Sequence, residues 1–413
     1  MQRYWFISMV TMLTIYVINI FFAAQVCAQQ FEFSGKRKKE TISFTSIKNL
    51  IIIPIYIDDK GPYNFLLDTG VGQMIITDTS FLKKINLEQS KTILIQGYGL
   101  GEGIEAILTR NVNARVGRST IKNIPTAIFK SDIFDLSAYL GVKIYGLLGY
   151  YFFNSFLVKV NYSSNKLTYY KNDSKVKIKG TKLPLRIINA KPYLSATIQT
   201  SEGADIKIEL LVDNGSSQPL MLESMNQQPF PLPLKTIPAN LGVGINGEIN
   251  GVMGRVNTLN IKDFTFNNVL TGFPEFSMKR SLQEGNTRNG TLGAEVLKNF
   301  HVTFDYKEEA IYLKKRRNFN YKFDHDMSGL EIYVEKTPKD RFYIGRVEPE
   351  SPAERAGIQS GDEILSINLR GMEYYTLNNI NELLKEYDGK QVIIEVQRKS
   401  QRLISILRLK KRI

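Results

Sequence analysis

Two acid-glycine triplets are the residues in this chain whose types and surroundings could do chemistry. Asp68-Thr69-Gly70 follows the run "NFLL", and Asp213-Asn214-Gly215 follows "IELLV". Asp and Gly are common turn formers, so one triplet alone would indicate only a turn. Two carboxylates about 3 Å apart, however, repel by roughly 5 kcal/mol at an effective dielectric constant near 20. Such a pair shares one proton, so one aspartate acts as a base toward a bound water and the other as an acid toward a carbonyl.

Other catalytic chemistries lack the residues they need. The whole chain has two histidines, His301 and His325, and one cysteine, Cys27. It contains neither a Gly-x-Ser-x-Gly motif nor a His-Glu-x-x-His motif. A Ser-His-Asp triad or a zinc site therefore has almost nothing to be built from. We expect no metal and no other cofactor, and we expect both histidines to be packed or surface residues.

The segments that must position the triplets are repeated along the chain. An offset of 145 residues superimposes the two triplets and the glycine-rich segments after them, and the offset then slips to 144. The superimposed pairs include Leu66 and Leu211, Gly70 and Gly215, Gly97 and Gly242, Gly149 and Gly293, and Tyr162 and Tyr306. A period of this length indicates a duplicated domain and not a solenoid unit.

Both halves of the repeat read as β structure. β-branched and aromatic residues occur in short alternating runs between turn residues, as in "LIIIPIYI" at 50–57, "FLVKVNY" at 156–162 and "HVTFDY" at 301–306. Few stretches look helical, although "LGAEVLKNF" at 292–300 could form one short helix. A chain of 413 residues is expected to hold two or three domains. The sequence therefore predicts a mostly β protein of several domains.

These features together resemble the aspartic proteases of the pepsin and retropepsin type. The resemblance is closest to bacterial two-lobed aspartyl-protease-like proteins with a C-terminal PDZ domain. It implies two duplicated pepsin/retropepsin-like β-barrel lobes, at 45–175 and 185–315, and an endopeptidase whose catalytic pair is Asp68 and Asp213. The residues implied to support this pair are Thr69, Gly70, Asn214 and Gly215.

The chain departs from the family pattern at the second triplet. Asn214 stands where the family has Thr or Ser, whose hydroxyls bond to the backbone of the opposite loop. Asn can donate through its amide and accept through its carbonyl, but it is longer than either. Val71 is also bulkier than the usual Ala or Ser. Two interpretations therefore remain open, an active endopeptidase and a non-catalytic peptide-binding scaffold.

A glycine-rich segment in the first half occupies the position of a family flap. "GYGLGEG" at 97–103 would form a mobile cover that excludes water, with Tyr98 as its aromatic tip. A plain hairpin explains the glycines equally well. The counterpart "LGVGINGEING" at 241–251 lacks the aromatic residue.

The last part of the chain, 328–413, resembles a PDZ domain of bacterial periplasmic proteases and follows a linker at 316–327. The resemblance rests on "IGRVEPESPAERAGIQSGDEILSIN" at 344–368, with "NNINELLKEY" at 378–387 as the helix beside the peptide groove. In "SGLEIYV" at 328–334, backbone amides would grip the terminal carboxylate of a peptide. The candidate binding residues are Gly329, Leu330, Ile332 and Leu383. The alternative is a domain that only packs, with a blocked groove.

The first 28 residues read as an export signal. Arg3 precedes an apolar run over residues 5–24, and Val26-Cys27-Ala28 offers a cleavage site before Gln29. An uncleaved membrane anchor is the alternative, whereas Val26 disfavours lipidation of Cys27. The mature chain would contain no cysteine, which fits the bacterial periplasm or outer surface. Residues 29–44 are left as a short N-terminal extension.

Charge gives little further information about partners. The net charge is +14, but the basic residues are scattered apart from short runs that read as solvated linkers or tails. A nucleic-acid surface would need a basic face interleaved with aromatic residues, and none is visible. We expect a monomer whose partners are a polypeptide substrate or the C-terminus of a peptide. A glycan or surface-adhesion function has only the basic charge in its favour.

Overall fold

The computed structural model describes residues 29–97, 99, 103–131, 135–200, 203–278, 288–317, 322–336 and 339–413. The expected export signal at 1–28 and the flap candidate Tyr98 lie outside these residues. Strands hold 51% of the chain and helices 10%, which confirms the predicted mostly β fold class. Among the described residues, none of the helices has the length and apolar character needed to cross a membrane.

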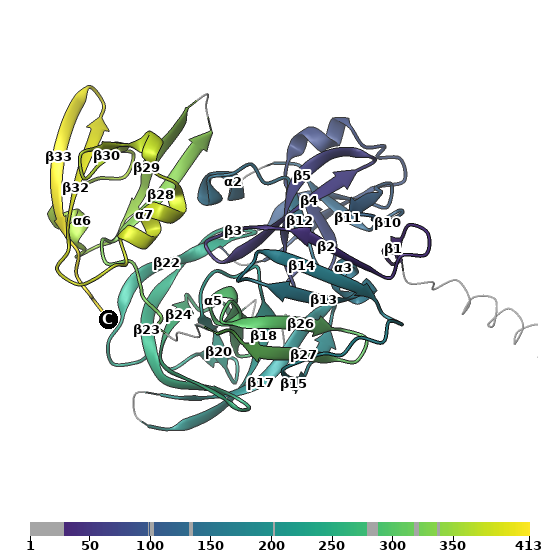
Figure 1. Ribbon diagram of the computed structural model, residues 1–413. Coiled ribbons are helices and arrows are strands. Elements are labelled where there is room, and N and C mark those ends of the chain that lie inside the picture. The colour runs from purple at the N-terminus through teal and green to yellow at the C-terminus, as the bar shows by residue number, and fades with distance from the viewer. Residues whose placement is uncertain are drawn as a thin grey trace, which may run out of the picture.

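The first half of the chain, which we call lobe 1, contains a curled sheet of eleven strands (Figure 1). Their order is β1-β10-β9-β4-β5-β12-β6-β11-β8-β7, and β3 pairs with β4. The bounds are β1 (Glu32–Phe33), β3 (Thr45–Ile47), β4 (Leu50–Ile57), β5 (Lys60–Leu67), β6 (Met74–Ile76), β7 (Lys91–Ile95), β8 (Ile104–Thr109), β9 (Ala114–Val116), β10 (Ser119–Ile121), β11 (Thr126–Phe129) and β12 (Gly146–Leu148). The helical segments of lobe 1 are the 3₁₀ helix η1 (Thr79–Lys83), α2 (Leu136–Leu140) and α3 (Tyr150–Ser155).

The second half, lobe 2, contains an eight-stranded sheet in the order β16-β17-β18-β25-β19-β24-β23-β22. The bounds are β16 (Arg186–Ile188), β17 (Lys191–Gln199), β18 (Asp205–Asp213), β19 (Leu220–Leu222), β22 (Ile237–Gly244), β23 (Gly247–Ile261), β24 (Phe264–Pro274) and β25 (Gly290–Gly293). The small hairpin of β20 (Ser224–Met225) and β21 (Gln228–Pro229) and the short helix α5 (Ala294–Leu297) complete this lobe.

The two sheets place corresponding strands in the same order. The path β4-β5-β12-β6-β11-β8-β7 in lobe 1 corresponds strand by strand to β17-β18-β25-β19-β24-β23-β22 in lobe 2. The directions agree as well, because β12 runs parallel to β5 and antiparallel to β6, and β25 does the same with β18 and β19. Asp68 directly follows β5, and Asp213 is the last residue of β18. Equivalent strands therefore deliver the two triplets.

A third sheet joins the lobes. Its order is β15-β27-β26-β13-β14-β2, with β13 (Phe156–Asn161) of lobe 1 antiparallel to β26 (Phe300–Asp305) of lobe 2. The other bounds are β2 (Lys39–Ser43), β14 (Lys166–Lys171), β15 (Thr181–Pro184) and β27 (Ala310–Lys315). Strand β2, which pairs with β14, lies in the segment that the sequence analysis left as an extension. The rings of Phe153 and Phe304 meet at 5.0 Å in the core that both lobes share.

The C-terminal domain has its own sheet and its own core. The strand order is β28-β29-β30-β32-β33, with β31 on β30, and β28 forms one edge. The bounds are β28 (Leu330–Lys336), β29 (Asp340–Val347), β30 (Glu363–Ile367), β31 (Arg370–Gly371), β32 (Gln391–Arg398), β33 (Gln401–Arg408), α6 (Pro352–Arg355), η3 (Met372–Tyr374) and α7 (Leu377–Leu383). The expected groove helix is thus present as α7, which Thr376 and Asn379 cap reciprocally.

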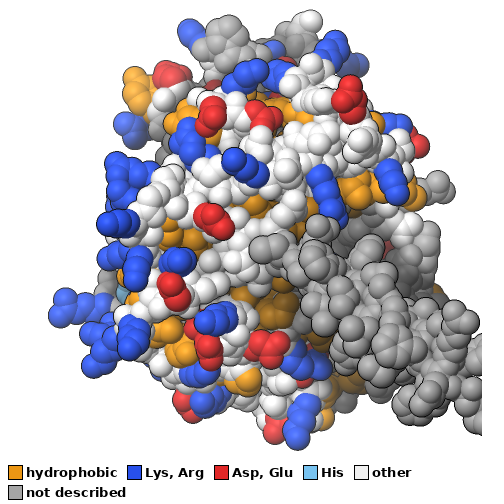
Figure 2. All heavy atoms as spheres, turned by 90° about the vertical axis from the view of Figure 1, so that its right-hand side faces the viewer, with side chains coloured by type: hydrophobic (Ala, Val, Ile, Leu, Met, Phe, Trp, Pro, Cys, Tyr) orange, Lys and Arg blue, Asp and Glu red, His pale blue; other side chains and the backbone are white. Residues whose placement is uncertain are grey.

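Charged groups are mixed over the visible surface. On the face in Figure 2, Lys and Arg side chains lie among acidic and uncharged ones. This view agrees with the scattered basic residues of the sequence.

Candidate active site

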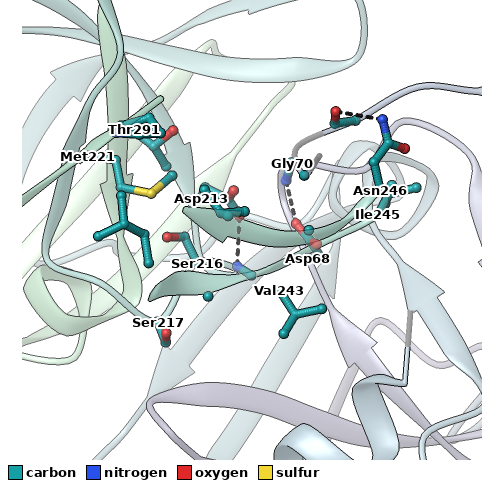
Figure 3. Close-up of a pocket in the computed structure, with 18 of the residues that line it drawn as sticks. Asp68, Gly70, Asp213, Ser216, Ser217, Met221, Val243, Ile245, Asn246 and Thr291 are labelled. Atoms are coloured by element: carbon teal, nitrogen blue, oxygen red, sulfur yellow. Dashed lines mark hydrogen bonds between the residues drawn. The ribbon is translucent and has the colours of Figure 1, made fainter. Parts of the chain in front are cut away.

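The structure brings Asp68 and Asp213 into one pocket of about 490 Å³ between the lobes (Figure 3). A Cβ atom added to Gly70 would lie 3.0 Å from Oδ2 of Asp213 and 3.1 Å from Oδ1 of Asp68, so both carboxyl groups border the same small space. A Cβ atom added to Gly215 would lie only 2.4 Å from Oδ2 of Asp68. Close approach of Asp68 therefore requires glycine at 215, whereas Asp213 leaves only a tight space at Gly70.

Backbone amides orient the two carboxyl groups in the same way. The amide of Gly70 donates to Oδ1 of Asp68 at 2.7 Å, and the amide of Gly215 donates to Oδ1 of Asp213 at 2.8 Å. Each aspartate thus accepts from the glycine two residues further on. Hydrogen bonds to a charged acceptor are stronger than neutral ones, which makes these turns rigid supports for the carboxylates.

Thr69 and Asn214 cross-link the two loops behind the aspartates. The hydroxyl of Thr69 donates to the carbonyl of Val212 at 2.7 Å and accepts from the amide of Asn214 at 3.1 Å. Asn214 makes the reciprocal pair with two atoms, because Oδ1 accepts from the amide of Thr69 at 2.7 Å and Nδ2 donates to the carbonyl of Leu67 at 2.8 Å. Both side chains are fully buried. Asn at this position therefore makes all the bonds that a hydroxyl makes on the other side.

Two glycines let a neighbouring strand brace each loop. A Cβ atom on Gly149 would lie 2.1 Å from the carbonyl oxygen of Val71, and one on Gly293 would lie 1.9 Å from that of Gln218. Just beyond them, the amide of Tyr150 donates to Val71 at 2.9 Å, and the next residue after Gly293 makes the equivalent bond in lobe 2 at 2.7 Å. The apolar-Gly segments noted in the sequence thus support equivalent loops.

The pocket perturbs the ionisation of Asp68. Burial and the charge of Asp213 raise the pKa of Asp68 well above its ordinary value, while the amide of Gly70 and the charge of Lys191 oppose this shift. Burial, with the charges of both aspartates, also raises the pKa of Tyr306. The hydroxyl of Tyr306 has no hydrogen-bond partner within the described part of the chain. The sequence analysis aligned Tyr306 with Tyr162 but assigned it no role, and no motif indicated Lys191.

Two hairpins meet over the pocket. Nδ2 of the Asn246 side chain, between β22 and β23, donates to the carbonyl of Gly97, between β7 and β8, at 3.1 Å (Figure 3). A Cβ atom on Gly99 would lie 2.4 Å from the backbone carbon of Asn246. The predicted flap segment therefore contacts its counterpart from lobe 2, although its tip Tyr98 is not described. The sequence analysis noted only that the second hairpin lacks an aromatic residue, so it missed Asn246.

The walls of the pocket differ between the lobes. Apolar lining from lobe 1 comes from Leu50, Leu66, Val71, Leu136, Tyr139 and Leu147. Lobe 2 adds a buried polar group, in which Arg288 donates to Glu223 at 3.0 Å and the hydroxyl of Thr291 donates to the same carboxylate at 3.0 Å. The side chain of Arg288 is 3% exposed. This charge pair was not predicted, because its members carry no motif.

The histidines lie away from the pocket. His301 is on β26, where burial and the charges of Lys314 and Arg316 lower its pKa. Burial lowers the pKa of His325 to about 4, and its ring accepts from the amide of Arg412 at 3.2 Å. Among the residues placed by the structure, no three His, Cys, Asp or Glu side chains gather as a metal site would require.

The candidate peptide-binding residues of the C-terminal domain lie around α7 and β28. Leu330 and Ile332 are buried in the domain core, and Leu383 packs against it half-buried. Gly329 has a φ of +79°, and a Cβ atom there would lie 2.2 Å from that of Ser351.

The amides expected to grip a peptide carboxylate already have partners in the chain. Ser328 and Gly329 donate to Oδ1 of Asp326 at 3.0 and 2.6 Å, and Leu330 donates to the hydroxyl of Ser328 at 3.0 Å. A peptide carboxylate would have to displace these bonds.

Comparison with known proteins identifies two domains. Residues 53–152 match the family model described as aspartyl protease, and residues 343–398 match the PDZ domain model. The crystal structure of the HtrA3 PDZ domain bound to a phage-derived ligand (FGRWV) aligns with 16% of this chain and 61% of its own chain, at 28% identity and a TM-score of 0.15. No curated protein matches the chain. The chain therefore contains an aspartyl protease domain and, toward its C-terminus, a PDZ domain, as the resemblance predicted.

Proposed function

We propose that this protein is an exported endopeptidase that hydrolyses peptide bonds with Asp68 and Asp213. The observation that carries the proposal is the pair of equivalent loops that aim two carboxyl groups at one space and are cross-linked behind it by Thr69 and Asn214. Export to the periplasm or medium rests on the signal-like residues 1–28.

The proposed reaction needs only one proton shared by the pair. The charged aspartate removes a proton from water as the water oxygen attacks the carbonyl carbon, and the protonated aspartate gives its proton to the carbonyl oxygen. On collapse of the tetrahedral intermediate, the aspartate that took the proton from water gives it to the leaving nitrogen as the C–N bond breaks. The other aspartate takes a proton from a hydroxyl of the intermediate, so the pair again holds one. No side chain becomes covalently attached to the substrate.

The bonds of Asn214 favour catalysis over a scaffold that only binds. The sequence argument for an inactive scaffold is that Asn214 is longer than the Thr or Ser of the family pattern. The structure provides Asn214 with both partners of the cross-link, and Asp213 keeps its amide bond. The substitution therefore gives no structural reason for loss of activity.

The pocket suggests an extended polypeptide as the substrate. The paired hairpins cover a cleft that runs between both lobes, with apolar side chains such as Leu66 and Leu147 on one wall. A PDZ domain in the same chain would raise the local concentration of a polypeptide at the pair of aspartates. We also propose that the protein is a monomer in which two duplicated lobes each supply one of the catalytic aspartates.

The test is to replace each aspartate separately. Asp68→Asn and Asp213→Asn should each lower the cleavage rate of an unfolded protein by about 10²–10⁴-fold over about pH 3–8, because general acid-base catalysis contributes that much. Asp173→Asn is the matched control, since Asp173 is 58% exposed and pairs only with a surface lysine.

Two results would contradict the proposal. Cleavage that survives either replacement would show that the pair is not catalytic. A wild-type protein that binds a peptide pool and leaves it intact, as judged by mass spectrometry, would indicate the scaffold.

A further inference from the structure

The end of a lobe 1 helix lies against both walls of the groove between β28 and α7 of the PDZ domain. Gly141, which follows α2, lies so close that an added Cβ atom would be 3.1 Å from Cγ2 of Val334 on β28 and 3.6 Å from Cδ2 of Leu377 on α7. Two residues earlier, the centres of the Tyr139 and Tyr333 rings lie 6.2 Å apart. Figure 1 shows α2 beside β28, between lobe 1 and the PDZ domain. The chain itself therefore contacts the groove at Val334 and Leu377.

A neighbouring turn of lobe 1 strengthens this contact. Asn378 on α7 donates to the carbonyl of Ser46 at 3.2 Å and accepts from the amide of Lys48 at 3.4 Å. The ammonium group of Lys48 lies 3.4 Å from the centre of the Tyr139 ring. Burial lowers the pKa of Lys48 to about 8, and the charge of Glu331 on β28 opposes that shift. Lobe 1 thus contacts both walls of the groove.

The PDZ domain also holds the lobe 2 hairpin that covers the pocket. Asn240 on β22 donates its side-chain amide to Glu331 at 2.8 Å and its backbone amide to Glu348 at 3.1 Å. Arg346 on β29 donates to Asn250 on β23 at 2.7 Å and lies 3.8 Å from Glu248. The same hairpin carries the amide that meets the first hairpin over the aspartates.

Both of the contacted elements also form the pocket. Leu136 and Tyr139 of α2 line its lobe 1 wall, and the residues from Leu241 to Asn246 line its lobe 2 side. Each element therefore faces the PDZ domain on one side and the aspartates on the other. Movement of the PDZ domain away from α2 would loosen a wall and a cover of the same pocket.

We propose that the PDZ domain clamps the pocket shut through α2 and the β22–β23 hairpin, and that an extended peptide entering the β28–α7 groove displaces α2 and opens it. β28 is a sheet edge, which can pair with an extended peptide as a further strand, whereas a helix such as α2 cannot pair with it in this way. The hydrogen bonds of the interface are partly buried, as in interfaces that separate and re-form, whereas the apolar contact of Gly141 with Val334 and Leu377 is buried. The regulatory part rests on the proposed peptidase function.

A reversible disulfide tests the clamp. In Gly141→Cys/Val334→Cys the Cβ atoms would lie about 3.3 Å apart, close to the range of about 3.5–4.5 Å in disulfides. The mature chain has no other cysteine if cleavage follows residue 28. The probe is a fluorescein-labelled pool of ten-residue peptides that end in a free carboxylate on Val, Leu or Phe. Binding is measured by fluorescence polarisation on the oxidised and then the reduced protein.

We expect the oxidised form to bind the pool at least tenfold more weakly than the reduced form, because α2 can no longer leave the groove. Each single cysteine variant, treated with the same oxidant, controls for strain at the positive φ of Gly141. Equal binding by the oxidised and reduced forms, or no binding by the reduced form, would overturn the proposal.

Hydrogen exchange in the wild-type protein provides a test that needs no substitution. Addition of the peptide pool should accelerate exchange at residues 136–141 and leave β5 of the same lobe unchanged. Unchanged or slower exchange at 136–141 would contradict displacement of α2.

Cleavage of unfolded casein by the same samples separates the two proposals. If binding responds to the disulfide but neither form cleaves casein, the groove proposal holds and the peptidase proposal fails. If both forms cleave casein equally, the clamp does not control the pocket.

Discussion

The loops around Asp68 and Asp213 make the same set of bonds with different side chains. In lobe 1 one hydroxyl, that of Thr69, both donates and accepts across the interface. In lobe 2 two atoms of the Asn214 side chain do this, because Oδ1 accepts and Nδ2 donates. The comparison teaches that the fold conserves the hydrogen-bond pattern at this position and does not require one residue type.

The loops are less alike in the space that they leave for the opposite carboxylate. At Gly215 an added Cβ atom would lie 2.3 Å from Cγ of Asp68, but at Gly70 it would lie 3.2 Å from Cγ of Asp213. Asp68 is 8% exposed, and Asp213 is half-buried. Lobe 1 thus supplies the more enclosed aspartate.

The largest expected effect comes from adding a methyl group in the narrower of the two spaces. Gly215→Ala must push Asp68 aside, and a displacement near 1 Å costs about 10²-fold in rate. Gly70→Ala requires a smaller adjustment and should retain more activity. The measurement is kcat/KM on one peptide substrate for both variants. Equal losses would show that the two loops tolerate a methyl group alike.

Removing the cross-link should cost stability on either side. Asn214→Ala leaves the amide of Thr69 and the carbonyl of Leu67 buried without partners, at about 1–3 kcal/mol each. Thr69→Ala should cost a similar amount for the same reason. Asn214→Thr restores a hydroxyl that can make both bonds, so we expect a loss of about 1 kcal/mol. Urea unfolding compares the three, and a threonine variant as unstable as Asn214→Ala would contradict the equivalence of the loops.

A smaller effect should appear in the pH dependence of stability. Because the pKa of Asp68 is raised in the folded state, its ionisation favours unfolding as pH rises above the unfolded value of 3.8. Asp68→Asn should therefore raise the melting temperature at pH 7 and lose this gain near pH 3. Calorimetry at both pH values checks this, and a gain independent of pH would disagree with it.

The sequence predicted the fold class and singled out two loops that the structure places at one pocket, because both features leave short-range patterns. Apolar runs that end in Asp-x-Gly, at matching positions of two halves, need no knowledge of contacts. The sequence shows that Asn214 can both donate and accept a hydrogen bond. It does not show which atoms it bonds to, because they belong to a loop 145 residues away.

The missed features depend on contacts between segments that lie far apart in the sequence. Gly141 contacts Val334 and Leu377 of the PDZ domain, which lie far from it in the sequence. In the sequence itself Gly141 reads as an ordinary helix end. In "KETIS" at 39–43, exposed and half-buried residues alternate as in a strand, but the charged residues hide the pattern. The buried pair of Arg288 and Glu223 likewise has no local signature.

The most direct test of the account is a titration of the aspartate side chains by ¹³C NMR in wild-type protein and in Asp213→Asn. If the two groups share one space and one proton, removal of the Asp213 charge lowers the pKa of Asp68, although burial keeps it above its ordinary value. A pKa of Asp68 that is the same in both proteins would show that the carboxyl groups do not interact, and the proposed chemistry would have no basis.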